Sequence, residues 1–449
     1  MIDLSPRLWR GDPMNDAASS LTVVIVGGGF SGAMLAARLA ERGQASALIE
    51  RGDAFGPGVA YSATLDAHRL NVRAERMSAL ADRPGDFADW LKAHHPDHAA
   101  PDGFPPRRLY GLYVAARLAA VEAAHQGLIQ RVKGEALAVE GRSVVLSDGR
   151  RIEGCTVVLA TGNPAPRTAA AGQSPRILPD PWAPGAFDRI QPNDAVLILG
   201  SGLTMVDVVL ALQARGWRGR ATAVSRRGLT PRAHGDHHDA PAALPPEALS
   251  GALSQRLAAA RKLAREHGWR RLMEGYRPIT AGLWRAATTA ERARFLRHLR
   301  PWWDVHRHRI APEIAAALDA LIAEGRLSVR AGRVSATEVS ADIVTLTVSA
   351  PGGAAQTLTA AWLIDCTGPG HDAAATPLTA ALIAAGRARL DPLKLGLDLD
   401  EAGRVLHADG AADPDLFLLG PPARAALWET IAVPDIRQRI ETLARALTA

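Results

Sequence analysis

The sequence predicts an α/β fold made of two similar units, joined by β-meanders and interrupted by a helical insertion. An apolar strand, a glycine-rich turn and a helical run follow one another at 22–43, and the pattern returns at 195–207. A hairpin and an apolar strand that ends in Thr-Gly occur at 144–162 and recur at 343–368. Between the repeats, the apolar spacing of 246–325 is mostly helical. A chain of 449 residues, 47% of them hydrophobic, can bury the core that such a fold needs.

The first unit has the spacing of a dinucleotide-binding turn. In TVVIVGGGFSG at 22–32, Gly27, Gly29 and Gly32 fit G-x-G-x-x-G, and the next apolar run ends at Glu50, 18 residues past the last glycine. Glycines let the backbone approach a pyrophosphate at the positive end of the helix, and an acid at this distance accepts a ribose hydroxyl. The pattern therefore predicts a Rossmann-like domain.

The second unit repeats this turn less completely. Gly200 and Gly202 follow the strand, but Met205 stands at the third glycine position, so we expect the helix and strand to pack less closely. The next strand ends in Ser225, Arg226 and Arg227, where an NAD site would show an acid. Guanidinium groups suit a 2′-phosphate, which favours NADPH. Two solvated surface arginines are the alternative interpretation.

Composition narrows the class of protein. The net charge of +6 permits an anionic ligand, but acids and bases alternate along the chain, so we expect no nucleic-acid partner. No uninterrupted apolar run reaches about 18 residues, so we expect no membrane span. Cys155 and Cys366 lie far apart in apolar runs, which indicates reduced thiols, a cytoplasmic protein and no redox-active pair of the kind that a disulfide reductase needs.

The N-terminal residues and a loop rich in His and Asp lead to two further expectations. Residues 1–14 lack the apolar core of a signal peptide and are expected to form a disordered leader, with Met14 as an alternative start. The loop His234–Asp239 is rich in His and Asp but lacks the ligand spacing of a zinc or iron site, so we expect no metal.

Tryptophan and arginine gather in the insertion at 246–325. Thr288 and Glu291 predict a capping box that opens a helix through Leu299. Around this helix cluster Trp269, Trp284, Trp302, Trp303, Arg270, Arg271, Arg300, Arg307 and Arg309. We expect a cap over an active site that holds a planar anion, with Arg300, Arg307 and Arg309 as candidate substrate-binding residues. Stacking of nucleic-acid bases and ordinary packing of the tryptophans are the alternatives.

Five segments carry a resemblance to a known family. They are VVIVGGGFSG at 23–32, GPGVAYS at 56–62, LNVRAERMSA at 70–79, GSGLTMVD at 200–207 and WETIAVPDIR at 428–437. Over nearly the whole chain, the sequence resembles the FAD/NAD(P)-binding proteins that include FAD-dependent urate hydroxylase. The resemblance implies FAD with NADPH or NADH as cofactors, and a small-molecule substrate and molecular oxygen as partners.

The resemblance also implies an activity. The main hypothesis is an FAD-dependent, NAD(P)H-consuming monooxygenase that hydroxylates urate to 5-hydroxyisourate in purine catabolism. The alternative is a flavin-dependent amine N-hydroxylase, which has the same two-domain arrangement. A non-catalytic flavin- or nucleotide-binding protein is a further alternative. The sequence assigns no oligomeric state.

The expected cofactor contacts follow from the turns and from the resemblance. They are Gly27, Gly29, Phe30, Ser31, Gly32, Glu50, Arg51, Asn71, Met77, Thr161, Gly162, Gly200, Gly202, Ser225, Arg226, Arg227, Gly368, Gly420, Ala432 and Val433. Pro434 and Asp435 predict a helix that begins near Val433, and its partial positive charge would suit a reduced, anionic flavin ring.

The expected domain division is discontinuous. Residues 15–190 and 331–449 would form an FAD-binding domain, and 191–330 an NAD(P)-binding domain that carries the cap at about 246–325.

Overall fold

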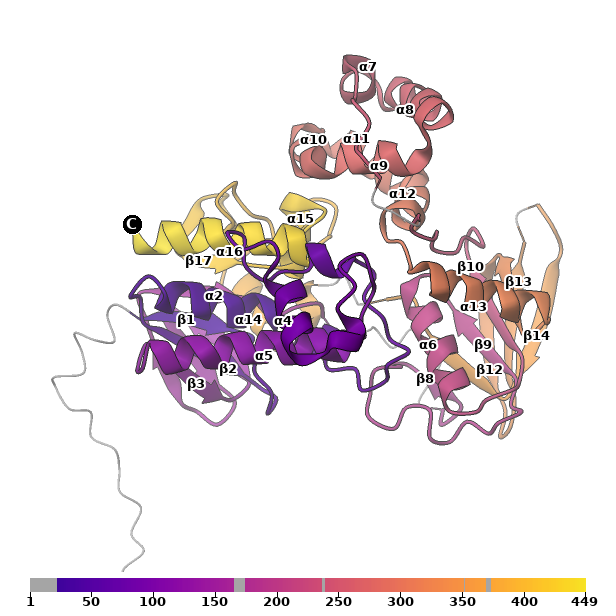
Figure 1. Ribbon diagram of the computed structural model, residues 1–449, viewed down its shortest axis with the longest axis horizontal. Coiled ribbons are helices and arrows are strands. Elements are labelled where there is room, and N and C mark those ends of the chain that lie inside the picture. Colours follow the sequence, from indigo (N-terminus) through magenta and orange to yellow (C-terminus); the bar gives the residue numbers. More distant parts are fainter. Residues whose placement is uncertain (1–21, 165–173, 236–238, 351, 369–372) are drawn as a thin grey trace, which may run out of the picture.

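The computed structural model describes residues 22–164, 174–235, 239–350, 352–368 and 373–449. The leader expected at 1–14 lies outside the described residues. Figure 1 shows two lobes side by side, with a group of short helices above them. The first lobe combines both ends of the described chain, and the second is built from its middle.

A six-stranded sheet forms the core of the first lobe, in the order β16-β17-β7-β1-β2-β3. Its strands are β1 (Val23–Val26), β2 (Ser46–Glu50), β3 (Ile129–Lys133), β7 (Thr156–Leu159), β16 (Arg404–Leu406) and β17 (Ala412–Leu418). All neighbours pair in parallel except β16 with β17. The central strand β1 is buried at every position, as a parallel strand with both faces covered requires.

The two faces of this sheet are covered differently. Helices α2 (Phe30–Ala40), α5 (Arg107–Ala124) and α16 (Val433–Thr448) pack on the face that holds Val23 and Ile25. The opposite face, with Val24 and Val26, packs against the meander β4 (Ala136–Glu140), β5 (Ser143–Leu146), β6 (Arg151–Glu153) and against α14 (Pro377–Ala384). Successive residues of a strand point to opposite faces, so β1 contributes to both cores.

The second lobe repeats this plan around a five-stranded parallel sheet, in the order β11-β10-β9-β15-β8. The strands are β8 (Ile177–Leu178), β9 (Val196–Leu199), β10 (Ala221–Ser225), β11 (Leu327–Ala331) and β15 (Trp362–Asp365). Helices α6 (Leu203–Ala214) and α13 (Pro312–Ala323) cover one face. The antiparallel sheet of β12 (Arg333–Val339), β13 (Val344–Ser349) and β14 (Ala355–Ala360) covers the other.

The prediction of two dinucleotide-binding α/β units with β-meanders is confirmed, but the strands divide differently from the expected boundaries. We expected 177–190 and 331–365 to belong to the FAD-binding part, whereas β8 and β12–β15 pair within the second lobe. The physical reason is the repeat itself. The strand after each meander completes the sheet of its own unit, so β15 lies beside β9 just as β7 lies beside β1.

The insertion is helical, as predicted. It contains α7 (Pro246–Leu249), α8 (Leu253–His267), α9 (Trp269–Tyr276), α10 (Thr280–Ala286), α11 (Thr289–His298) and α12 (Arg300–Arg307). The capping box is present: Glu291 N donates to Thr288 Oγ1 at 3.3 Å, and Thr288 N donates to Glu291 Oε2 at 2.8 Å. We call this insertion the cap.

The remaining helices are short, apart from α4. They are α3 (Gly58–Tyr61), α4 (Asp86–His94), α15 (Arg424–Leu427) and the 3₁₀ turns at 74–76, 96–98, 277–279, 373–375 and 421–423. Among the helices of the described segments, none has the length and apolar character that a membrane crossing requires.

Tryptophan side chains fix the cap to the C-terminal segment of the first lobe. Trp284 stacks on Trp428, with ring centroids 4.6 Å apart, and its Nε1 donates to the carbonyl of Ala425 at 2.8 Å. Trp303 Nε1 donates to Glu429 Oε1 at 2.6 Å. Trp428 has a φ of 57°, a left-handed conformation that a bulky residue adopts only where its surroundings hold it. The cap is therefore docked by specific contacts.

Candidate functional site

The first glycine turn has the close approaches that its spacing predicts. Gly27 has a φ of 110°, and a Cβ there would lie 2.4 Å from the carbonyl oxygen of Ala160. A Cβ at Gly32 would lie 1.9 Å from the carbonyl oxygen of Gly27. Gly29 caps α2, whose first turn holds Phe30 and Ser31. Only glycine at 27 and 32 lets the strand, the turn and α2 pack this tightly.

Glu50 lies at the carboxyl end of β2, beside the glycine turn. Its Oε2 accepts a hydrogen bond from Gly28 N at 2.7 Å, and its Oε1 accepts one from Gly52 N at 2.9 Å. These bonds hold the carboxylate at the edge of the sheet where a ribose hydroxyl is expected. Arg51, the next residue, is exposed.

Several other predicted FAD residues lie near the same sheet edge. Thr161 and Gly162 follow β7, which lies beside β1. A Cβ at Gly420, after β17, would lie 2.6 Å from Ser31 Oγ. Ala432 caps α16, which begins at Val433 as predicted. In open α/β sheets this carboxyl edge is where ligands bind, and the glycines leave the backbone accessible there.

Three predicted residues have side chains in other surroundings. Phe30 is 7% exposed and lies in an aromatic cluster, 5.9 Å from Tyr110 between ring centroids. Met77 is 2% exposed and packs in the core of the first lobe, as does Val433. These side chains stabilise the fold, and only their backbone atoms remain for a ligand.

The second glycine turn repeats the close approach at the first glycine but not the one at the third. Gly200 has a φ of 97°, and a Cβ there would lie 2.4 Å from the carbonyl oxygen of Cys366, as Gly27 does with Ala160. Gly202 caps α6, and a Cβ there would meet no atom within 4 Å. Met205, at the third glycine position, is fully buried in the core of the second lobe. Gly368, with a φ of 94°, follows β15.

Arg226 and Arg227 follow β10 and are exposed. In the described segments, neither guanidinium group has a hydrogen bond or ion pair within the chain. Ser225 is held instead, with its Oγ 2.7 Å from Ser201 Oγ. Both arginines are therefore available to a 2′-phosphate at the end of β10, where the second ribose of a Rossmann site lies.

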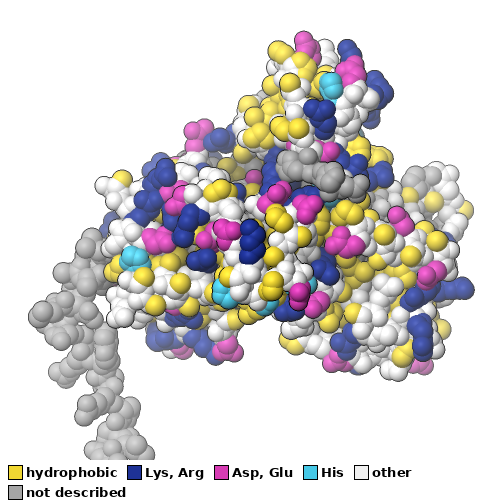
Figure 2. All heavy atoms as spheres, in the orientation of Figure 1, with side chains coloured by type: hydrophobic (Ala, Val, Ile, Leu, Met, Phe, Trp, Pro, Cys, Tyr) yellow, Lys and Arg dark blue, Asp and Glu magenta, His cyan; other side chains and the backbone are white. Residues whose placement is uncertain are grey.

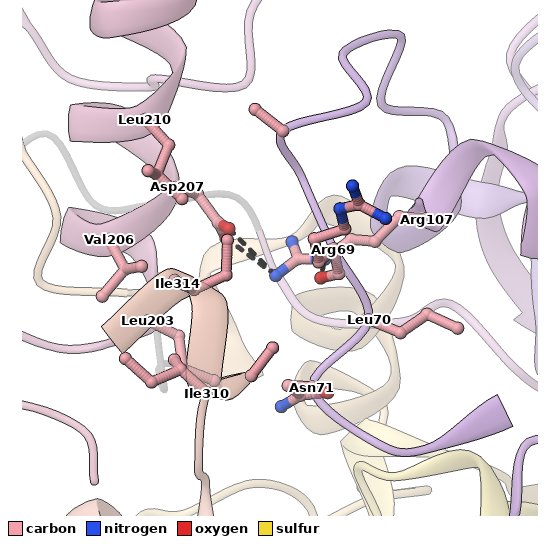
Figure 3. Close-up of a pocket in the computed structure, with 12 residues that line it drawn as sticks. Arg69, Leu70, Asn71, Arg107, Leu203, Val206, Asp207, Leu210, Ile310 and Ile314 are labelled. Atoms are coloured by element: carbon pink, nitrogen blue, oxygen red, sulfur yellow. Dashed lines mark hydrogen bonds and ion pairs between the residues drawn. The ribbon is translucent and has the colours of Figure 1, made fainter. Parts of the chain in front are cut away.

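An ion pair between a buried aspartate and a half-buried arginine joins the two lobes, and no sequence pattern predicted it. Arg107, at the start of α5, places Nη2 2.9 Å from Asp207 Oδ2 on α6 (Figure 3). His68 Nε2 lies 3.2 Å from the carbonyl oxygen of Asp207. Burial raises the pKa of Asp207, although Arg107 opposes that shift. The pair ties the FAD-side helix α5 directly to the helix that follows the second glycine turn.

A cavity lies between the segment 71–76, the cap and the start of α16. Its volume is roughly 560 Å³ when the space that is open to solvent is included. Its lining consists of Asn71, Val72, Arg73, Arg76, His234, Asp239, Glu274, Arg277, Arg307, His308, Arg309 and Ala432. In the space-filling view, Lys and Arg side chains lie where the cap meets the lobes (Figure 2). We call this space the arginine cavity.

Two of the three predicted substrate arginines line the arginine cavity, and both are paired. Arg309 Nη2 lies 3.2 Å from Glu274 Oε1. Arg307 Nε lies 3.3 Å from Glu429 Oε2, and its Nη2 lies 3.4 Å from Asp435 Oδ2. Arg300 does not line the cavity, and its Nε lies 3.3 Å from Asp304 Oδ2.

The titratable groups of the arginine cavity have definite charge states. Burial lowers the pKa of His234 to about 4, and its Nε2 lies 3.0 Å from the carbonyl oxygen of Asn71, so the ring is neutral and fixes that loop. Burial raises the pKa of Glu274, but Arg76 and Arg309 outweigh it and hold the pKa below the ordinary value. The carboxylate of Glu274 is therefore charged.

Part of this cavity was not predicted from the sequence. Arg73 and Arg76 stand inside the segment LNVRAERMSA but had no assigned role, and Glu274 and Arg277 carried no signal. His234 was considered only for a metal. Among the described residues no group of three His, Cys, Asp or Glu side chains is placed to hold a metal ion. Cys155 and Cys366 are both free, and burial raises the pKa of Cys366 well above its usual value.

Comparison with known proteins agrees with this architecture. A family model described as FAD-NAD(P)-binding matches residues 24–164, which confirms the predicted resemblance for that part of the chain. A comparison with curated proteins gave no match.

Three solved structures are similar over the whole chain. The first is an ornithine N-hydroxylase from Kutzneria sp. 744 with reduced FAD, NADP⁺ and L-ornithine, with 18% identity, a TM-score of 0.65 and coverage of 95% of this chain and 99% of that one. The second is an L-lysine 6-monooxygenase from Pseudomonas syringae, with 19% identity, a TM-score of 0.63 and coverage of 95% and 98%. The third is an FAD-bound cadaverine monooxygenase from Erwinia amylovora, with 13% identity, a TM-score of 0.67 and coverage of 95% and 94%. At these identities the likeness shows the fold.

Proposed function

We propose that this FAD- and NAD(P)-binding protein is a flavin-dependent monooxygenase that consumes NADPH and molecular oxygen. The observation that carries the proposal is one arrangement. Two glycine turns that share their first close approach stand in one chain, and a cavity lined by charged side chains lies between the lobe of the first turn and the cap. The fold, similar over 95% of the chain to N-hydroxylases, agrees with this proposal.

The residues present fit FAD. The close packing at Gly27 and Gly32 leaves backbone N–H groups at the start of α2 for the pyrophosphate, and Glu50 is held for a ribose hydroxyl. Asn71 and Ala432 border the arginine cavity, so the flavin ring would lie on the substrate side of the sheet edge. When bound, FAD supplies hydride acceptance from NADPH and the activation of oxygen.

Amine N-hydroxylation is the first candidate reaction. A nitrogen–oxygen bond forms on the amine and the oxygen–oxygen bond breaks. NADPH gives two electrons, one oxygen atom enters the product and the other leaves as water: RNH₂ + O₂ + NADPH + H⁺ gives RNHOH + NADP⁺ + H₂O. The part of the chain itself would be to position the substrate and to exclude water, and the contacts of Trp284 and Trp303 with the C-terminal segment hold the cap in place for this. The three similar structures described above, which act on ornithine, lysine and cadaverine, support this candidate.

Hydroxylation of urate is the second candidate. The observation that favours it is the set of five arginines that line the cavity, since planar guanidinium groups suit a planar oxyanion. A disulfide reductase is disfavoured because Cys155 and Cys366 are single thiols. A fold of this kind hosts several chemistries, so the site has to carry the assignment.

The experiment begins with the cofactor. Purified protein should bind FAD, and Gly32→Ala should reduce the FAD content several-fold, because the added methyl group would clash with the carbonyl of Gly27. Gly282→Ala is the control, since a Cβ at Gly282 meets no atom within 4 Å. Absorbance after desalting gives the FAD content. Equal FAD content in both variants would place the cofactor elsewhere.

Turnover is then measured as oxygen uptake with NADPH or NADH, in the presence of L-ornithine, L-lysine, 1,5-diaminopentane or urate. We expect one amine to be hydroxylated in step with oxygen uptake. Coupled loss of urate absorbance would favour the second candidate instead. NADPH oxidation that ignores every substrate and yields only hydrogen peroxide would contradict a monooxygenase that acts on these classes.

A further inference from the structure

We propose that Arg277 binds an acidic group of the substrate, so that the arginine cavity takes a small molecule with a carboxylate or an equivalent oxyanion. This inference rests on the proposed function, because it assigns the substrate to that cavity. It adds a substrate class and a specificity-determining residue.

Among the described residues, Arg277 is the arginine of this cavity that has neither an ion pair nor a hydrogen bond from its buried Nη2. It begins the 3₁₀ turn after α9 and lines the cavity from the cap side. Its Nη2 is buried and has no hydrogen bond, and in the described part of the chain the side chain forms no ion pair. A buried donor left without an acceptor costs about 1–3 kcal/mol, so such a group calls for an occupant.

The other four arginines of the cavity are held by the protein. Arg76 and Arg309 share the carboxylate of Glu274, at 3.1 and 3.2 Å. Arg307 lies against two acids of the C-terminal segment, as described above. Arg73 Nη1 and Nη2 donate to the carbonyl oxygens of Asp102 and Gly235, at 2.5 and 2.6 Å.

The charge balance of the cavity favours an anion over a diamine. Five arginines line it against two acids, Asp239 and Glu274, and His234 is neutral. Burial, with Arg307 and Arg76, lowers the pKa of Arg277 to about 10, although Asp435 and Glu274 oppose this shift, so the side chain stays charged near neutral pH. A substrate with only ammonium groups would add positive charge beside these guanidinium groups. A carboxylate would give Arg277 the acceptor that it lacks.

The test compares ligands that differ in one group. L-Ornithine and 1,4-diaminobutane differ only in the carboxylate, and glutarate carries carboxylates without an amine. Binding to the FAD-loaded protein is measured by tryptophan fluorescence without NADPH, so the readout does not depend on turnover. We expect L-ornithine and glutarate to bind, and 1,4-diaminobutane to bind at least tenfold more weakly.

The variants locate the effect. Arg277→Gln should weaken glutarate about tenfold or more, and Arg277→Lys should give an intermediate affinity because it keeps the charge without the planar fork. Arg261→Gln, which removes an exposed arginine from α8 of the same cap, should bind as the unmodified protein does. FAD content and melting temperature show that each variant is folded. Should Arg277→Gln not fold, Arg277→Lys alone decides.

Three results overturn the inference: no binding of glutarate or L-ornithine, equal binding in Arg277→Gln, or 1,4-diaminobutane binding as tightly as L-ornithine. A different result separates it from the proposed function. If glutarate binds through Arg277 but no substrate stimulates oxygen uptake, the anion site stands and the monooxygenase proposal fails.

Discussion

At the scale of single residues, each glycine-turn unit has two positions that would contact different parts of a dinucleotide. The glycines would let the backbone approach the pyrophosphate, and the residue at the end of the second strand would contact the ribose. In the first unit that residue is Glu50, held by two backbone N–H groups. In the second unit the corresponding strand ends beside two arginines without partners among the described residues.

Replacing Arg226 and Arg227 together by alanine should therefore weaken NADPH and leave NADH little changed. Each charge-assisted contact to a phosphate contributes about 1.5–3 kcal/mol, so the KM for NADPH should rise about tenfold or more per arginine. Steady-state kinetics with both nucleotides measures this. Similar losses for both nucleotides would contradict a role in reading the 2′-phosphate.

Glu429 provides a prediction on stability and pH. It is buried, pairs with Arg307 and accepts a hydrogen bond from Trp303. Glu429→Gln leaves Arg307 with Asp435 alone, and should lower the free energy of unfolding by about 3 kcal/mol, the low end for a broken buried pair. Glu401→Gln, at an exposed site, should change it by less than about 0.5 kcal/mol.

The pH dependence of this loss has a defined sign. Burial raises the pKa of Glu429, but Arg307 and His308 outweigh it and hold the pKa below the ordinary value. The charged pair thus stabilises the protein above the unfolded pKa of about 4.3, and this stabilisation is lost as the pH falls through the lower, folded pKa. The difference between Glu429→Gln and the unmodified protein in urea unfolding should shrink below about pH 4. A difference that stays constant from about pH 7 down to well below pH 4 would speak against the ionised pair.

At the scale of elements, the cap is held by aromatic contacts rather than by chain connectivity alone. Helix α10 reaches the C-terminal segment through Trp284, and α12 reaches it through Trp303 and Arg307. Arg307 also lines the arginine cavity, so the cap and the cavity share this contact. We expect the docking of the cap to affect both the stability of the protein and the access of water.

Trp284→Ala should uncouple oxygen consumption from product formation. The variant loses the stack on Trp428 and the hydrogen bond to Ala425, and truncation of a buried tryptophan costs about 3–5 kcal/mol. The fraction of NADPH oxidised to hydrogen peroxide should rise, because water enters a loosened site. Trp302→Ala is the matched control, since Trp302 is 44% exposed on the same cap. An unchanged peroxide fraction in a folded Trp284→Ala protein would mean that this contact does not shield the reaction.

At the scale of the whole molecule, the two lobes are two copies of one plan, joined by a buried charge pair. Asp207 follows the second glycine turn by one helical turn, and Arg107 starts the helix that packs on α2. This ion pair connects α6 of the second lobe to α5 of the first lobe (Figure 3).

Arg107→Gln should remove the ion-pair partner of the buried Asp207 and lower the free energy of unfolding by about 3–5 kcal/mol. The double variant Arg107→Gln with Asp207→Asn should recover much of that loss, because no buried charge remains unpaired. Thermal unfolding measures both, and stopped-flow reduction by NADPH reports whether the lobes still align. Additive losses in the double variant would contradict a direct interaction.

Much of the fold follows from local patterns. The glycine turns, the meander-strand repeat, the capping box at Thr288 and the helix start at Val433 each depend on a few neighbouring residues, so the sequence predicts them. The boundaries between lobes do not, because strand pairing joins segments far apart in the chain, such as β15 with β8 and β9.

The sequence by itself determined the class of protein, an FAD- and NAD(P)-binding chain of two α/β units, and it predicted an arginine-rich helical insertion. The tertiary structure alone decided what those arginines do. Arg307 and Arg309 are paired within the protein, whereas Arg277 is left without a partner in the described part of the chain. The physical reason is that glycine spacing is dictated by the local backbone. The charge state and availability of a side chain depend on which carboxylates the fold brings beside it.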